Sequence, residues 1–125
     1  MSAATWVKIG RNHTPLDPPL ALKVCRTFSS RLRGFLFSSS PTPELGLLFW
    51  YSHPSRFDTA IHMIGVPFSL AVIWLDDNRK VIDKRIAQPW QFAIIPKSAA
   101  QYVIECHPQR ECEFVIGEII DFLGV

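Results

Sequence analysis

The sequence predicts a mainly β fold, a small barrel or sandwich-like antiparallel sheet with one or two short helices. Short runs of β-branched and aromatic residues recur between turns rich in Gly, Pro, Asn and Asp, which is typical of such folds. No segment has the long helical period expected of a doubly wound α/β protein. Hydrophobic residues make up 48% of the 125 residues and charged residues 19%, so one domain can bury its own core. We expect residues 1–19 to form an N-terminal edge segment with a turn, and residues 20–125 to form a single compact β-rich domain.

Three prolines and an alternating pattern of apolar residues predict the structure of the first 25 residues. Pro15, Pro18 and Pro19 lack backbone donors and disfavour helix in the residues before them. Residues 1–19 should therefore hold one short edge strand and a turn. Apolar residues occupy every second position from 20 to 25, which predicts a strand with one buried face.

A short helix is predicted over about residues 30–37. Ser29 or Ser30 can accept a hydrogen bond from a free amide at the helix start. Three apolar residues then recur at helical spacing: Leu32, Phe35 and Leu36. The helix should end before residues 38–43, where Ser and Pro favour a loop.

The central segment is predicted to be rich in strands. Residues 47–51 form one strand, residues 52–56 a polar turn, and residues 57–75 a strand region that Gly65 and Pro67 interrupt with a bend or bulge. Residues 68–75 and 80–86 should pair as an antiparallel hairpin, because Asp and Asn between them favour a turn. Further strands are expected at residues 102–106, 114–116 and 119–122.

Charge, apolar run length and cysteine count limit the classes of function. The net charge is +2 and the basic residues are scattered, which argues against a nucleic-acid surface. The apolar stretch from Val66 to Leu75 is about half the length of a membrane span. The first residues lack the pattern of a secretory signal, and three cysteines are an odd, widely spaced set. We therefore expect a cytoplasmic protein without nucleic-acid or membrane partners.

His62 and Trp90 are the first candidates for a functional site. The imidazole of His62 titrates near neutral pH, and its apolar neighbours could perturb it as acid–base chemistry requires. A histidine beside a core strand can equally be a structural hydrogen-bonding residue. Trp90 follows a proline in a predicted loop, where its ring could line a cleft instead of filling the core.

Two charged residues complete the candidate set. Arg31, on the predicted helix, could bind a carboxylate or an anionic ligand, although a surface arginine is usually only solvated. Glu105 lies in the group Glu105, Cys106, His107 and Cys112, but on a strand Glu105 and Cys106 point to opposite faces. The spacing of this group matches no standard zinc site, so we expect no metal and no other cofactor. Cys106 is predicted to pack in the core.

Several ordered motifs are similar to those of the family called Domain of Unknown Function 192, over about residues 20–123. They are Arg31, Gly34 and Phe35-Leu36, then Gly46-Leu47-Leu48-Phe49, Ile61-His62-Met63, Phe68 to Asp76, Pro89-Trp90, Val103-Ile104-Glu105 and Gly117-Glu118. The resemblance implies a compact, mainly β domain with one short helix and no established activity. The chain departs from the family at Ala71, where relatives usually carry Asp, and at Glu118, which replaces Asp.

The sequence leaves three functions open. The first is a binding module whose cleft is lined by His62, Trp90, Arg31 and Glu105 and accepts a small polar ligand or a peptide. The second is a hydrolase or lyase with His62 and Glu105 as its acid–base pair. The third is a protein-interaction or assembly domain with an apolar patch around Trp6 or Phe122-Leu123. The sequence does not determine whether the protein is an enzyme, nor its oligomeric state.

Overall fold

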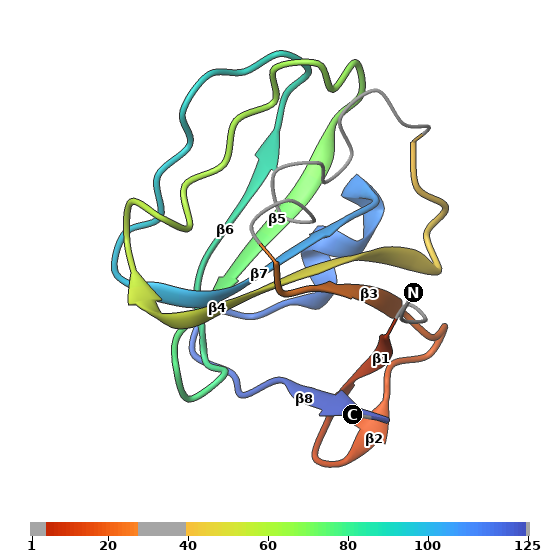
Figure 1. The fold of residues 1–125 in the computed structure, drawn as a ribbon. Helices are drawn as coiled ribbons and strands as arrows, with labels where there is room; N and C mark the ends of the chain where they lie inside the picture. Colours follow the sequence, from red (N-terminus) through yellow and green to blue (C-terminus); the bar gives the residue numbers. More distant parts are fainter. Residues whose placement is uncertain (1–4, 28–39, 125) are drawn as a thin grey trace.

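The computed structural model describes residues 5–27 and 40–124, which fold into one curled β-sheet with a single short 3-10 helix (Figure 1). In chain order the elements of these ranges are β1 (Trp6–Arg11), β2 (Thr14–Pro15), β3 (Ala21–Cys25), β4 (Leu45–Ser55), β5 (Leu70–Leu75), β6 (Val81–Ala87), β7 (Ala100–Cys106), the 3-10 helix η1 (Pro108–Glu113) and β8 (Asp121–Leu123). The described ranges contain no helix that is both long and apolar enough to cross a membrane. The mainly β class predicted from the sequence is confirmed.

The sheet is curled into half of a barrel. Its strand order is β2-β1-β3-β4-β7-β5-β6, and β8 pairs with β1. Just before β6, at the opposite end of the strand order, Lys80 forms a bridge with Ile119, and the amide of Ile120 donates to the carbonyl of Arg79 at 2.9 Å. These contacts bring the segment before β8 against the start of β6, which curls the sheet around its core.

One strand pair departs from the antiparallel arrangement predicted from the sequence. β3 and β4 are parallel, whereas the other paired strands are antiparallel. A parallel pair requires a long connection that returns the chain to the same end of the sheet, and residues 26–44 supply that length. Local alternation could not reveal this, because it reports which face of a strand is buried and not which way its neighbour runs.

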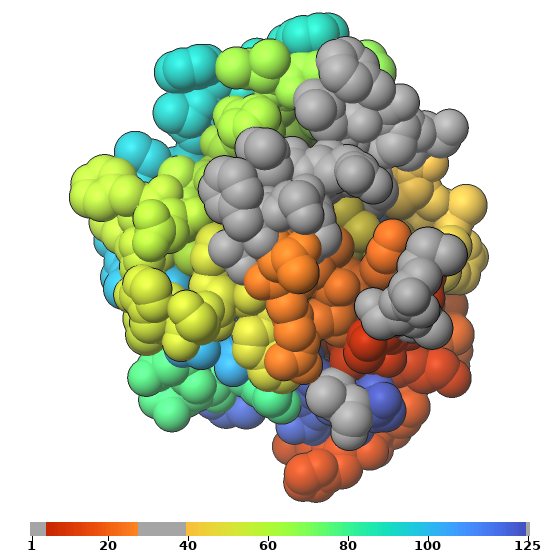
Figure 2. Space-filling view, in the orientation of Figure 1, coloured from red at the N-terminus to blue at the C-terminus, as the bar shows by residue number. Residues whose placement is uncertain are grey.

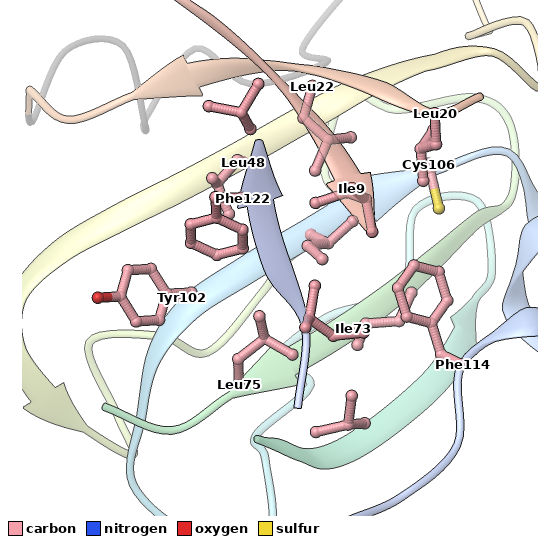
Figure 3. Close-up of a cluster of buried hydrophobic side chains, with 14 of the residues drawn as sticks. Ile9, Leu20, Leu22, Leu48, Ile73, Leu75, Tyr102, Cys106, Phe114 and Phe122 are labelled. Atoms are coloured by element: carbon pink, nitrogen blue, oxygen red, sulfur yellow. The ribbon is translucent and has the colours of Figure 1, made fainter. Parts of the chain in front are cut away.

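The first core cluster lies inside the curl. It joins side chains from β1, β3, β4, β5, β7 and β8 with Phe114, which follows η1 (Figure 3). Its members include Ile9, Leu20, Leu22, Leu48, Ile73, Leu75, Tyr102, Cys106, Phe114 and Phe122. Burying each large side chain of this kind contributes about 1.5–3 kcal/mol of hydrophobic stabilisation.

The second core cluster covers the opposite face of the sheet. Sheet residues such as Phe49, Val72, Trp74 and Val103 meet residues of two loops, which are Ile61, Met63, Val66 and Ile94. Because strand residues alternate between faces, β7 places Ile104 and Cys106 in the first cluster and Val103 in the second. Glu105 shares the face of Val103.

Several predicted elements are confirmed and others are wrong. The strand at 20–25, the hairpin of 68–75 with 80–86 and the strand at 102–106 correspond to β3, the β5–β6 pair and β7. Residues 57–69, expected to be extended, form loops with one isolated bridge, because Gly65 has a φ of 82° and redirects the chain at a turn. Residues 114–116, also expected to be a strand, form the irregular segment that follows the end of η1 at Glu113. The strand expected at 119–122 overlaps β8.

The N-terminal strand and the predicted turn at 52–56 also differ from expectation. β1 pairs with β3 on one side and β8 on the other, so it is not an edge strand. Its residues Val7 and Ile9 are buried. β4 continues through 52–55, with an irregular register between Trp50 and Ser55. The predicted helix at 30–37 lies outside the described residues.

Candidate functional site

His62 is exposed at the surface of a loop that packs on the second core cluster. Its neighbours Ile61 and Met63 are buried, and alternation of the extended backbone turns the imidazole outward. The amide of Ile61 donates to the carbonyl of Ile94 at 2.9 Å, and the amide of Ile94 donates back at 2.7 Å. This two-way pairing fixes the loop of His62 against the loop that follows β6.

Trp90 is exposed on the neighbouring loop and has an unusual backbone conformation. Its side chain is 58% exposed, and its φ is 61°, in the left-handed region that a bulky residue rarely adopts. The amide of Trp90 donates to the carbonyl of Val66 at 3.2 Å, and the turn is closed by a bond from the amide of Gln88 to Oε1 of Gln91 at 3.0 Å. Such a conformation costs about 1–3 kcal/mol and is typical of functional positions.

His62 and Trp90 lie on two loops that are joined by backbone hydrogen bonds and that carry several exposed aromatic side chains. We call the exposed side chains of Phe57, His62, Ile64, Trp90 and Phe92 the loop surface. Phe57 is 69% exposed and Phe92 is 73% exposed. The two loops that carry them are joined by the Ile61–Ile94 bridge and by a bond from the amide of Met63 to the carbonyl of Gln91 at 2.7 Å. They run side by side in Figure 1, and their atoms lie at the upper left of Figure 2.

Polar contacts attach these loops to the sheet from beneath. The indole N–H of Trp74 donates to the carbonyl of Thr59 at 2.8 Å. The buried carboxylate of Asp83 accepts the amide of Lys97 at 3.0 Å, and Arg85 donates to the carbonyl of Ile95 at 2.8 Å. The loop surface is therefore held on a rigid scaffold, which lowers the entropy lost when a partner binds.

Glu105 lies in the interior and not on the loop surface. It is 5% exposed and pairs with Leu47 on β4 and Val72 on β5. No hydrogen bond or ion pair joins its carboxyl to any residue of 5–27 or 40–124. Burial raises the pKa of Glu105 to about 8, from an ordinary value of 4.5. The carboxyl is therefore mainly protonated at neutral pH.

The structure divides the candidate residues predicted from the sequence. His62 and Trp90 share the loop surface, Glu105 is buried in the sheet, and Arg31 lies outside the described residues. His62 is exposed and Glu105 is buried, and no hydrogen bond connects them within the described chain. The contact that an acid–base pair of these residues would need is thus not made in this conformation.

Cys106 and the potential metal ligands were the remaining candidates for chemistry in the sequence. Cys106 is buried, and its burial raises the pKa of the thiol to about 12, although the nearby Arg110 acts in the opposite direction. This thiol is unsuited to act as a nucleophile. Among the described residues, no group of three or more His, Cys, Asp or Glu side chains is placed to hold a metal ion.

Thiol labelling checks the burial of the cysteines. Cys112 is exposed and Cys25 and Cys106 are buried. In the native protein we expect a thiol reagent to modify Cys112 rapidly and the other two only after denaturation, because a buried thiol neither ionises nor meets the reagent. Peptide mapping by mass spectrometry identifies the modified residue. Rapid labelling of Cys106 in the native state would contradict its placement in the first core cluster.

The sequence offered two places for an apolar patch, around Trp6 or around Phe122-Leu123, and the structure exposes the first more than the second. Phe122 is buried, whereas Trp6 is exposed and borders an open groove of about 340 Å³. The groove is lined by Trp6, Val7, Lys8, Ala21, Leu123 and Gly124. Its walls are mainly apolar, and the ends of β1, β3 and β8 form them.

Three members of the loop surface were not predicted from the sequence. Phe57, Ile64 and Phe92 are apolar, and apolar residues are normally assigned to a core. The available signal was their position in loops, since Phe57 follows Pro54-Ser55-Arg56 and Phe92 follows Pro89. Exposure itself depends on which segments pack together, and that is a property of the folded chain.

Sequence comparisons relate the chain to proteins of unassigned function. The sequence model of DUF192, described as "Uncharacterized ACR, COG1430", matches residues 10–117. A UPF0127 protein of Thermococcus sibiricus is 35% identical over 100 residues, which cover 80% of this chain and 62% of that protein. A UPF0127 protein of Thermococcus kodakarensis is 36% identical over 84 residues, covering 67% of this chain and 52% of the relative. The chain thus spans between half and two thirds of the length of these relatives.

Two solved structures share the fold. A crystal structure described as a putative transcription regulator from Sinorhizobium meliloti matches with a TM-score of 0.81 and 16% identity, covering 98% of this chain and 96% of that one. A protein of unknown function from Novosphingobium aromaticivorans matches with a TM-score of 0.77 and 15% identity, covering 94% and 84%. At these identities the likeness concerns the fold alone.

Proposed function

Because this chain belongs to the uncharacterised conserved family DUF192, whose description carries no activity, we propose its function from geometry: the domain binds a peptide segment of another protein at the loop surface. Trp90 is the anchor of this site. The observation that carries the proposal is that a tryptophan with a φ of 61° is held 58% exposed on a loop that also carries the exposed Phe92. A strained backbone conformation that holds an apolar ring in solvent is expected where that ring binds another molecule.

The composition of the loop surface supports a protein partner. Tryptophan is among the residues enriched at the energetic centres of interfaces, and large aromatic rings contribute contact area with few rotatable bonds. Phe57, Trp90 and Phe92 supply three such rings on two hydrogen-bonded loops. His62, exposed on one of these loops, adds a hydrogen-bonding group for the backbone of an extended segment.

The acid–base alternative receives less support from the same geometry. It would require His62 to approach Glu105, but the first is exposed and the second is 5% exposed on the sheet. Glu105 also lacks a described partner that would orient it as a catalytic acid. A hydrolytic activity lost in both His62→Ala and Glu105→Gln would restore this alternative.

A peptide selection tests the proposal. A random peptide library is selected on the wild-type domain, and the affinity of the enriched peptides is measured by fluorescence anisotropy. Trp90→Ala should weaken binding by at least about tenfold, because removal of a central anchor commonly costs about 2 kcal/mol or more. Trp6→Ala is the matched control, since Trp6 is also exposed but lies on β1.

A glycine variant separates folding from binding. Glycine adopts a φ of 61° without strain, so Trp90→Gly should fold at least as stably as the Trp90→Ala variant while it loses binding. Denaturant unfolding measures the first property and anisotropy the second. Equal affinity of wild type and both Trp90 variants for every enriched peptide would refute the proposed site.

A further inference from the structure

The segments that build the loop surface contain no acidic residue over long stretches. Residues 59–75 and residues 84–104 carry neither Asp nor Glu. These stretches carry the basic residues Lys84, Arg85 and Lys97 together with His62, and Arg56 lies just before the first of them. Lys84 forms an ion pair with Glu111. The chain as a whole has a net charge of only +2, so this distribution is local.

Of the two carboxylates near these basic groups, that of Asp83 is occupied by an ion pair, whereas that of Asp58 is exposed. Asp83 is buried and pairs with Arg85 at 2.9 Å. Asp58 lies 3.8 Å from the imidazole of His53. In the described ranges no ion pair involves Arg56 or Lys97, and Arg56 donates its Nε–H to the carbonyl of Pro96 at 2.8 Å. Two positive charges beside the loop surface therefore lack a carboxylate partner within the described chain.

We propose that the partner segment is acidic as well as apolar, with carboxylates that meet Arg56 and Lys97 beside the apolar residues that contact Trp90 and Phe92. This inference rests on the proposed function and specifies its partner. Complementary charge at the rim of an interface increases the association rate and excludes partners of the wrong sign. The apolar rings supply affinity at the centre.

The same charges argue against a second copy of this chain as the occupant. A two-fold symmetric contact would place the same surface on both sides, so that two surfaces with an excess of positive charge would meet. Like charges brought together are destabilising. A partner of opposite charge has no such penalty.

A membrane surface is the other anionic candidate, and the charge count disfavours it. Each basic residue near an anionic bilayer contributes about 1 kcal/mol, and among the described residues of these two loops Arg56 and Lys97 are the ones without a carboxylate partner. Stable attachment usually needs a larger basic cluster or a lipid anchor. A peptide with a few carboxylates can instead match two cations and three rings.

The composition of selected peptides tests this inference. The library selection is repeated with counter-selection against the Trp90→Ala variant, so that the retained peptides depend on Trp90. These peptides should be enriched in Asp and Glu next to Phe, Leu, Trp or Ile, and rising salt should weaken their binding. Trp90-dependent peptides without an excess of acidic residues would overturn the inference and leave the proposed function intact. The absence of any Trp90-dependent peptide would overturn both.

A charge reversal provides the direct test. The side chain of Lys97 is exposed and only its backbone amide bonds to Asp83, so Lys97→Glu should leave the fold unchanged. We expect it to weaken binding of the acidic peptides by about five- to tenfold. Lys8→Glu, at an exposed position of β1, makes the same change of net charge elsewhere and should have a far smaller effect. Equal losses in the two variants would overturn the inference. So would Trp90-dependent binding to vesicles of phosphatidylserine and phosphatidylcholine that is tighter than binding to the peptides.

Discussion

Replacing Glu105 with glutamine is expected to remove a large part of the pH dependence of stability between pH 4.5 and about 8. Burial raises the pKa of Glu105 in the folded state, so the folded protein holds a proton that the unfolded chain releases above its ordinary pKa of 4.5. The free energy of unfolding therefore falls as the pH rises through this range and levels off above about 8. The whole shift corresponds to a loss on the order of 5 kcal/mol.

The glutamine variant is informative because it resembles the protonated acid. It should match the wild type in stability near pH 4.5 and be clearly more stable above about pH 8. Urea unfolding across this pH range, followed by fluorescence, measures both curves. Glu44→Gln is the control, since Glu44 is exposed and its replacement should leave the pH dependence as in the wild type. Parallel curves for wild type and the Glu105 variant would contradict the raised pKa of Glu105, because a carboxyl with the same pKa in the folded and unfolded states adds no pH dependence to stability.

Replacing Arg110 with methionine is expected to destabilise the fold by about 3–5 kcal/mol. Arg110 is 1% exposed, and its Nε lies 2.7 Å from the carboxylate of Glu113. Its terminal nitrogens donate to the carbonyls of Pro18 at 2.7 Å, Pro43 at 3.2 Å and Pro19 at 3.4 Å. Methionine fills much of the same volume but leaves the acceptors and the carboxylate without a donor, and such groups are costly when buried.

A second arginine serves as the control for this prediction. Arg11 pairs with Glu118 at 2.7 Å, but its side chain is 33% exposed, so water screens the pair. Arg11→Met should therefore cost about 1 kcal/mol or less. Arg110→Lys should recover only part of the lost stability, because the ammonium of lysine cannot reproduce the planar arrangement of N–H donors in the guanidinium. Denaturant midpoints compare the variants, and equal losses for Arg11→Met and Arg110→Met would contradict a special role for Arg110.

Arg110 explains how parts of the chain far apart in sequence are joined. From the 3-10 helix η1 it reaches the loop before β3 and the segment before β4. Nothing in the surrounding Pro-Gln-Arg-Glu-Cys-Glu distinguishes it from a solvated arginine. Its burial arises because the carbonyls of three prolines from two other segments converge on one point. This residue was accordingly absent from the candidates drawn from the sequence.

In the candidate site, too, some features follow from neighbouring residues in the sequence and others from contacts between distant segments. Trp90 could be singled out because a tryptophan after Pro89 in a loop has few neighbours along the chain to bury it. The sequence also grouped Trp90 with Glu105, which the structure buries on β7 between its strand neighbours Leu47 and Val72.

The sequence by itself determined the mainly β class, the β5–β6 hairpin and the opposite orientation of Glu105 and Cys106, because these depend on alternation and turn chemistry over a few residues. Only the tertiary structure decided the parallel pairing of β3 with β4, the burial of Arg110 and the exposure of Phe57 and Phe92. Each of these depends on which distant segments meet. The free energy of such contacts comes from desolvation and packing between elements, and a single sequence records the side chains but not their neighbours.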